Sequence, residues 1–175
     1  FIRYFLRFRT LQYWIKSRKM NKLFTLLILS LILFSCQPEG RIFSENKELS
    51  AELQWLKEDV IKFQVPVDDF SSSYNMSLNF RYATGYQYDV LKVRVTEISP
   101  SGKELVDEYD LKIRDENGDY IGEAALDIWD SEHLIKEKMK FSEGGTYTYK
   151  IEHVMPKDPL HFAMEIGVIL DKAKE

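Results

Sequence analysis

Cys36 is the only cysteine in the 175 residues, so it is the one side chain that could form a thioether, a disulfide or a thiolate ligand. It directly follows Leu33-Phe34-Ser35, at the end of an apolar run that begins at Leu23. The short basic start Met20-Asn21-Lys22 precedes that run. A basic start, an apolar stretch and a small residue before the cut are typical of a secretory signal peptide. The sequence therefore predicts cleavage after Ser35, which makes Cys36 the first residue of the exported chain.

A cysteine at this place resembles the lipobox of bacterial lipoproteins, in which the thiol is diacylated. The alternative is a buried cysteine behind a membrane helix, but the apolar run has 12 residues and a spanning helix needs roughly 20. Two or three acyl chains anchor a protein firmly, because each buried CH₂ contributes about 0.8 kcal/mol. We therefore expect Cys36 to be lipidated and the lipid bilayer to be a partner. Acylation of Cys36 would leave no thiol for a disulfide, a zinc site or a nucleophile.

The chain divides into four segments on this interpretation. Residues 1–19 precede Met20 and are basic and aromatic, and we interpret them as an upstream extension outside the fold. The other three are a signal peptide (20–35), a lipidated tether (36–46) and a folded domain (47–175). The first 35 residues hold seven of the 24 lysines and arginines and none of the 28 acids, so the exported chain has a net charge of −11. This acidity argues against nucleic-acid binding and against direct adhesion to anionic lipid headgroups.

Histidines and acidic residues give two weak metal-site candidates. His153 and His161 could face each other across a hairpin, but a zinc site needs a third ligand and supporting hydrogen bonds. Asp115, Asn117 and Asp119 alternate as the first oxygen ligands of a calcium loop do. The bidentate glutamate of such a loop is missing, because position 126 is a leucine. We therefore favour surface histidines and a polar turn, and expect no metal and no other cofactor.

Aromatic and acidic residues leave a sugar-directed function open. Trp55, Trp129, Tyr86 and Tyr88 could form a platform for sugar rings, although such aromatics more often belong to a sandwich core. A glycosidase needs two carboxyl groups at a fixed separation in a cleft, which adjacent acids in a sequence do not show. The chain also lacks the nucleophile-elbow, phosphate-loop, dinucleotide and zinc-protease motifs. The residues thus favour a protein that is not an enzyme. Glycan binding is the second interpretation, and a hydrolase is the third.

Apolar and polar residues alternate through most of the chain after residue 60. A period of two is what a strand with one buried and one solvated face requires. It predicts strands around 61–67, 76–82, 91–95, 105–113, 135–141, 147–151 and 162–170. Within 135–141 the alternation places Lys136, Lys138 and Lys140 on the solvent side. Before them, Leu49, Leu53 and Leu56 have the i, i+4, i+7 spacing of a helical turn or two ending near Trp55.

Turn residues separate the predicted strands. Asn117-Gly118 suits a tight hairpin, because both residues tolerate positive φ. Gly144-Gly145 divides two further strands, and Pro66 marks its strand as an edge or a strand end. Seven or eight strands joined by short turns predict an all-β fold, namely an antiparallel β-sandwich.

Several short motifs follow one another in a fixed order. Tyr74-Asn75 leads into Leu78-Asn79-Phe80-Arg81, Tyr86 and Tyr88 form a Y-x-Y, and Gly118 to Gly122 reads G-D-Y-I-G. In this order the chain from about Arg41 resembles the GldH family of gliding-motility lipoproteins from Bacteroidota. The resemblance implies a non-catalytic outer-membrane lipoprotein, which serves as an assembly or stability component of machinery linked to type IX secretion. The alternative is a glycan-binding lipoprotein of a surface polysaccharide uptake system.

Arg81 is the one charged residue inside a strong strand pattern. It could simply face solvent, or it could form an ion pair or a partner contact, because a guanidinium binds a carboxylate through two hydrogen bonds. No catalytic residue is established for the family, so the resemblance assigns no catalytic role to any residue here. Arg81 is instead a possible contact residue for other gliding or secretion proteins.

The residues after Cys36 bear on the side of the membrane that the domain faces. They read Gln37-Pro38-Glu39-Gly40 and include a single acid, whereas surface-exported lipoproteins of this phylum tend to carry several acids there. We therefore expect an outer-membrane anchor with the domain in the periplasm. A tether of about ten residues would hold the domain within roughly 35 Å of the bilayer.

Overall fold

The computed structural model describes residues 40–174, and this part of the chain consists of strands, turns and loops. Eight strands have seven or more residues: β1 (Arg41–Glu48), β3 (Ile61–Val67), β4 (Tyr74–Ala83), β5 (Val90–Ile98), β6 (Glu104–Lys112), β8 (Ile128–Met139), β9 (Gly145–His153) and β11 (Ala163–Lys172). Three short strands are β2 (Gln54–Trp55), β7 (Glu123–Ala125) and β10 (Leu160–His161). Within residues 40–174 no helix has the length and apolarity to cross a membrane.

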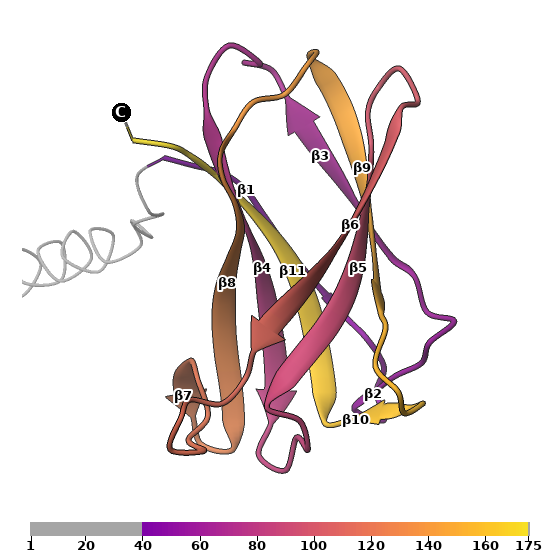
Figure 1. Ribbon diagram of the computed structural model, residues 1–175, viewed down its shortest axis with the longest axis vertical. Helices are drawn as coiled ribbons and strands as arrows, with labels where there is room; N and C mark the ends of the chain where they lie inside the picture. Colours follow the sequence, from indigo (N-terminus) through magenta and orange to yellow (C-terminus); the bar gives the residue numbers. More distant parts are fainter. Residues whose placement is uncertain (1–39, 175) are drawn as a thin grey trace, which may run out of the picture. The chain divides into compact units, whose positions relative to one another are not determined.

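The strands form two large antiparallel sheets and one small one. The five-stranded sheet has the order β1-β11-β4-β8-β7, the four-stranded sheet has the order β3-β9-β5-β6, and β10 pairs with β2 (Figure 1). The inner faces of the two large sheets pack on each other around one apolar core. The prediction of an all-β antiparallel sandwich is therefore confirmed.

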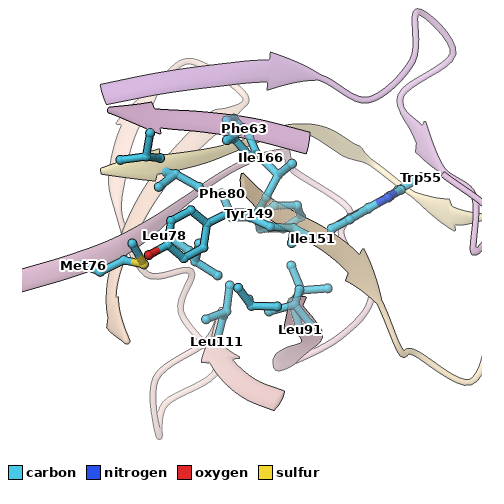
Figure 2. Close-up of a cluster of buried hydrophobic side chains, with 14 of the residues drawn as sticks. Trp55, Phe63, Met76, Leu78, Phe80, Leu91, Leu111, Tyr149, Ile151 and Ile166 are labelled. Carbon is cyan, nitrogen blue, oxygen red and sulfur yellow. The ribbon is translucent and has the colours of Figure 1, made fainter. Parts of the chain in front are cut away.

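On β4 and β9 the core is built from the side of the strand that the alternation assigned to the interior. Leu78 and Phe80 of β4 lie near Tyr149 and Ile151 of β9, with Trp55 at one margin (Figure 2). All five are fully buried. Burial of each such side chain contributes about 1.5–3 kcal/mol, so this layer stabilises the packing of the two sheets.

The sandwich has two ends, which we name by a residue at each. The Arg41 end holds the start of β1, the finish of β11 and the β3–β4, β5–β6 and β8–β9 connections. The Leu126 end holds the tip of the β7–β8 hairpin, the β4–β5 loop and the β2–β10 pair (Figure 1).

The predicted tether of residues 36–46 includes part of a strand in the structure. Arg41–Glu48 is β1, which pairs with β11 and places Asn46 opposite Gly167. Its sequence hides this role because β1 is an edge strand in which no residue is fully buried. Four residues, 37–40, therefore lie between Cys36 and β1. Cys36 itself and the predicted signal peptide lie outside the described residues.

The helical turn expected near residues 49–56 is not present. The chain makes a turn instead, with Leu53 at a φ of 55°, and then forms β2 against β10. The Trp55 indole is fully buried, and its Nε1 donates to the Asp59 carbonyl oxygen at 3.0 Å. Burial of this indole and pairing of β2 outweigh the weak helical spacing of the three leucines, since propensity over two turns is small.

Lys136 was expected on the solvent side of its strand and lies instead between the sheets. Two register shifts where β8 pairs with the start of β4 change the face on which its residues lie. Lys136 Nζ lies 3.3 Å from Glu97 Oε2 and 3.2 Å from Asp107 Oδ2, both on the opposite sheet. Lys138 and Lys140, in contrast, are exposed as predicted.

Candidate functional site

Arg81 lies on β4 and bridges the strands on either side of it. Its Nε and Nη2 donate to the two carboxylate oxygens of Asp130 on β8 at 2.9 and 3.0 Å. Its Nη1 donates to Glu165 Oε1 on β11 at 2.6 Å. The hydrogen bonds with Asp130, followed by those with Glu165, raise the pKa of the guanidinium above its ordinary value. Arg81 is therefore a cross-strand ion-pair residue, and two of its five N–H groups remain free of these bonds.

The ion pairs of Arg81 belong to a row of charges across the five-stranded sheet. The pairing registers place Glu48 beside Glu165 and Glu123 beside Asp130, on the same side as Arg81. One arginine thus stands among four acids. Both Glu48 and Glu123 are exposed, so the row presents unneutralised carboxylates at its two margins.

A second cluster on the same sheet lies nearer the Arg41 end. Arg41 donates to both carboxylate oxygens of Asp171 at 3.0 and 3.2 Å, and its Nη2 lies 3.4 Å from Glu132 Oε2. Between the two clusters, Asn46 covers Gly167, where an added Cβ would lie 1.8 Å from the Asn46 Oδ1. We call this surface the Arg81 face, with the members Arg41, Asn46, Glu48, Arg81, Glu123, Asp130, Glu132, Glu165 and Asp171.

The four-stranded sheet carries a similar trio on its own outer face. Arg94 on β5 donates from Nε and Nη2 to Glu108 Oε1 at 3.0 and 2.8 Å, and from Nη1 to Glu152 Oε1 at 3.0 Å. An arginine between two acids therefore occurs three times in this fold, at Arg41, Arg81 and Arg94. The Arg94 trio differs in that Glu108 is on the edge strand β6, so no further strand adds an acid beyond it.

The histidines are part of the fold and do not meet as ligands. His153 is buried, packs edge-on against Trp55 and lies with Nε2 3.1 Å from the Trp55 carbonyl oxygen. His161 is exposed on β10. Within residues 40–174 no three histidine, cysteine or acidic side chains are grouped as metal ligands would be. His153 thus holds β2 against the core.

The Asp115 carboxylate organises the turn for which calcium binding was considered. Its Oδ1 accepts hydrogen bonds from the backbone N–H groups of Asn117 at 2.8 Å and Asp119 at 2.9 Å. Gly118 has a φ of 86°, as the Asn-Gly turn requires. These donors lower the pKa of Asp115 below its ordinary value. The spacing of polar residues is thus explained by a hydrogen-bonded turn.

The four aromatics considered as a sugar platform do not share an exposed surface. Trp55 and Tyr86 are fully buried. Trp129 packs against Tyr120 with ring centroids 5.2 Å apart, and Tyr88 packs edge-on against Tyr86 at 6.0 Å. These rings form part of an aromatic cluster at the Leu126 end, where they contribute to stability.

A small open cavity lies beside this cluster. Its volume is about 220 Å³, and it is lined by Gln87, Tyr88, Lys157, Asp158, Pro159 and His161. The Asp158 carboxylate already accepts a hydrogen bond from the Lys57 backbone N–H at 3.0 Å. This size is below that of ordinary ligand pockets, which begin at roughly 300 Å³.

Known proteins match this sandwich over nearly its whole length. The profile of the GldH lipoprotein family matches residues 41–170. The chain belongs to the GldH lipoprotein family. The match begins at the first residue of β1 and ends inside β11, so the family domain and the sandwich coincide.

Two curated relatives come from flavobacteria. A protein of Christiangramia forsetii named gliding motility lipoprotein GldH homolog is 29% identical over 134 residues, which are 76% of this chain and 80% of the relative. The gliding motility lipoprotein GldH of Flavobacterium johnsoniae is 32% identical over 130 residues, which are 74% of this chain and 79% of the relative. Both names support a role in gliding motility for this lipoprotein family.

Solved structures resemble the chain only remotely. A 4-O-methyl-α-glucuronidase of family GH115 aligns with a TM-score of 0.42 and 11% identity. The alignment covers 80% of this chain but 19% of that enzyme. A likeness of this size carries no argument about activity.

Proposed function

We propose that this protein is a non-catalytic component of the gliding motility machinery, linked to type IX secretion, which assembles or stabilises its partners at the outer membrane. It is held to the bilayer by acylated Cys36, and its sandwich faces the periplasm. The observation that carries the proposal is the family match across the entire sandwich. Because the family domain and the sandwich coincide, we infer that the function of the family resides on the surface of this one domain.

The chemistry of the surface agrees with a binding role. The charged groups considered as functional candidates have partners within the fold: Arg81 with Asp130 and Glu165, and Asp115 with backbone N–H groups. Held in this way, they form a rigid charged surface that needs no reordering when a partner binds. The free N–H groups of Arg81 and the marginal acids Glu48 and Glu123 make the Arg81 face the surface that we assign to the machinery.

The experiment that tests this assignment compares Arg81→Met with Arg94→Met in the host bacterium. Both changes remove an arginine from between two acids, one on each sheet, and keep an unbranched side chain. We expect Arg81→Met to reduce gliding and to weaken crosslinking to envelope proteins in native membranes. Arg94→Met should leave both near the wild-type level.

The outcome is interpretable only if both variants fold. Each arginine is partly exposed, so its loss should cost little folding free energy, and protein abundance in the envelope checks this. Equal gliding in the two variants at equal abundance would contradict the role of the Arg81 face.

The anchor has a separate test. Cys36→Ser removes the chain's only thiol, so we expect it to abolish incorporation of labelled palmitate and to leave the protein uncleaved or unattached. Gliding should then fail even though the sandwich is unchanged. Palmitate incorporation equal to that of the wild type would refute Cys36 as the lipidation site.

A further inference from the structure

The β3–β4 loop at the Arg41 end presents an exposed aromatic ring. Phe70 is 51% exposed, although large apolar side chains are usually covered in a folded domain. One part of the ring rests on the backbone of the β8–β9 turn, where a Cβ added at Gly144 would lie 3.3 Å from Phe70 Cδ1. The rest of the ring faces outward.

Hydrogen bonds hold the loop that carries this ring. Asp69 Oδ1 accepts from the Ser71 backbone N–H at 3.1 Å and from its hydroxyl at 2.6 Å, and Asp69 Oδ2 accepts from the Ser72 hydroxyl at 2.5 Å. The Tyr74 hydroxyl donates to the Asp69 carbonyl oxygen. Phe70 is therefore presented by an ordered loop, which needs little further ordering to make a contact.

The same loop is tied to the point where the described chain begins. Lys172 Nζ lies 3.2 Å from Asp69 Oδ2, and the Lys172 backbone N–H donates to the Gly40 carbonyl oxygen at 2.8 Å. Gly40 stands four positions after Cys36. Five Cα–Cα steps from Cys36 to Arg41 span at most about 18 Å. This is less than the roughly 26 Å length of an eight-residue strand such as β1, so an acylated Cys36 keeps this end of the sandwich close to the bilayer.

Other side chains at this end suit a lipid surface. Ile42, next to the chain entry, is also 51% exposed. Lys138 and Lys140 are exposed at the same end of β8 and have no ion-pair partner among residues 40–174. The exported chain as a whole is acidic, but lysines that an acyl anchor holds within a Debye length of a membrane are attracted locally to lipid phosphates. An aromatic or aliphatic side chain beside them enters the interface.

We propose that the Arg41 end of the sandwich rests on the membrane, with Phe70 inserted into the headgroup region as a second contact beside the acyl chains. The inference rests on the proposed anchor at Cys36. The short connection argues for a lipid occupant, because a protein partner would have to fit between this end and a bilayer at most about 18 Å from Arg41. The contact fixes the orientation of the domain and directs the Leu126 end away from the membrane.

The test uses the acylated protein in vesicles of phosphatidylethanolamine and phosphatidylglycerol. Acylation blocks Cys36, so Phe70→Cys creates a single free thiol for an environment-sensitive fluorophore. Leu126→Cys is the matched control, because Leu126 is 100% exposed at the opposite end. Ile42→Cys provides a second position at the Arg41 end if the Phe70 variant does not fold.

We expect lipids with a quencher near the headgroup to quench the fluorophore at positions 70 and 42 severalfold more strongly than at position 126. Equal quenching at the two ends, in protein that floats with the vesicles, would overturn the inference and leave the anchor intact. Protein that carries no acyl group and does not float would overturn the anchor and this inference together.

Discussion

At the scale of single residues, His133 is a side chain whose charge state in mild acid depends on the fold. Burial lowers its pKa to about 4. The Ser131 hydroxyl donates to the Phe80 carbonyl oxygen at 3.1 Å, so it accepts from His133 Nε2, which lies 2.9 Å away. His133 is therefore neutral in the folded protein, with its proton on Nε2.

This lowered pKa predicts a loss of stability in mild acid. An unfolded histidine has a pKa of about 6.5, so the stabilisation is fully present above that value and is lost as pH falls toward 4. Between pH 7 and pH 5 the wild type should lose about 2 kcal/mol of unfolding free energy through this group. Urea unfolding at the two pH values measures the change.

His133→Gln keeps a donor for Ser131 without a titrating ring, so it should lose less stability over the same pH interval. His161→Gln removes an exposed histidine and should behave as the wild type. The buried His153 also has a lowered pKa. Because His153 is present in the wild type and in both variants, it contributes equally to the pH dependence of all three proteins. An unchanged pH dependence in His133→Gln would show that the ring is not the group responsible.

The residue scale also shows what the sequence could predict of the site. The strand pattern singled out Arg81, and bidentate pairing was one interpretation of it. Its partners lie 49 and 84 residues away, on strands whose order depends on the complete fold. The acidic row of the Arg81 face therefore became visible only with the pairing registers of β1, β11, β4, β8 and β7.

At the scale of elements, β7 depends on a close backbone approach at Gly122. A Cβ at this position would lie 2.2 Å from the Asp130 carbonyl oxygen, and the φ of Gly122 is 126°. Both features require glycine. They allow Glu123 to pair with Asp130 and so complete the row of charges.

Gly122→Ala should therefore lower the unfolding free energy by roughly 3 kcal/mol, because the backbone of β7 or β8 must move. Gly118→Ala is a matched control, since Gly118 has a φ of 86° but open space around an added Cβ. Its cost should be about 1–2 kcal/mol, from left-handed backbone strain alone. Thermal unfolding compares the two, and equal shifts in melting temperature would argue against the steric contact.

The elements that the sequence predicted include the strands with one fully buried face, and also β6 and β8, which are only partly buried. In strands β3, β4 and β9 the buried residues follow the predicted alternation closely; Phe63 of β3 and Ile151 of β9 are examples. The edge strand β1 and the short strand β7 were missed because their pattern is weak: no residue of β1 is fully buried, and β7 is exposed throughout. The edge strands β3 and β6 of the other sheet were predicted. The face of Lys136 was wrong because register shifts arise from pairing, which local alternation does not record.

At the scale of the whole molecule, the distance between anchor and domain decides what the protein can reach. With the proposed anchor at Cys36 and 37–40 as the connection, we expect the domain to lie closer to the membrane than the roughly 35 Å tether had predicted. A partner must therefore either lie at the bilayer surface or bind the Leu126 end of the sandwich. That end is separated from the Arg41 end by about the length of β8.

The periplasmic placement makes a prediction for intact cells. Protease added outside should spare the domain, and it should digest the domain once the outer membrane is permeabilised. The physical reason is exclusion of the protease by the outer membrane, since the exposed loops at both ends of the sandwich offer cleavage sites. Immunoblotting before and after permeabilisation measures the outcome. Loss of the domain from intact cells would place it on the cell surface instead.

The pairing of β1 with β11 also decides when the protein can finish folding. These strands are the first and the last of the domain in sequence, although they are neighbours in the sheet. Arg41 pairs with Asp171, which is 130 residues away along the chain. A chain that crosses a membrane from its amino terminus delivers β1 first and β11 last. Until the last strand arrives, β1 has no neighbour in its sheet, and β4 lacks one of its two. For a chain exported as we propose, we therefore expect the five-stranded sheet to close only after β11 has crossed the membrane, so that this sheet completes in the compartment to which the chain is delivered.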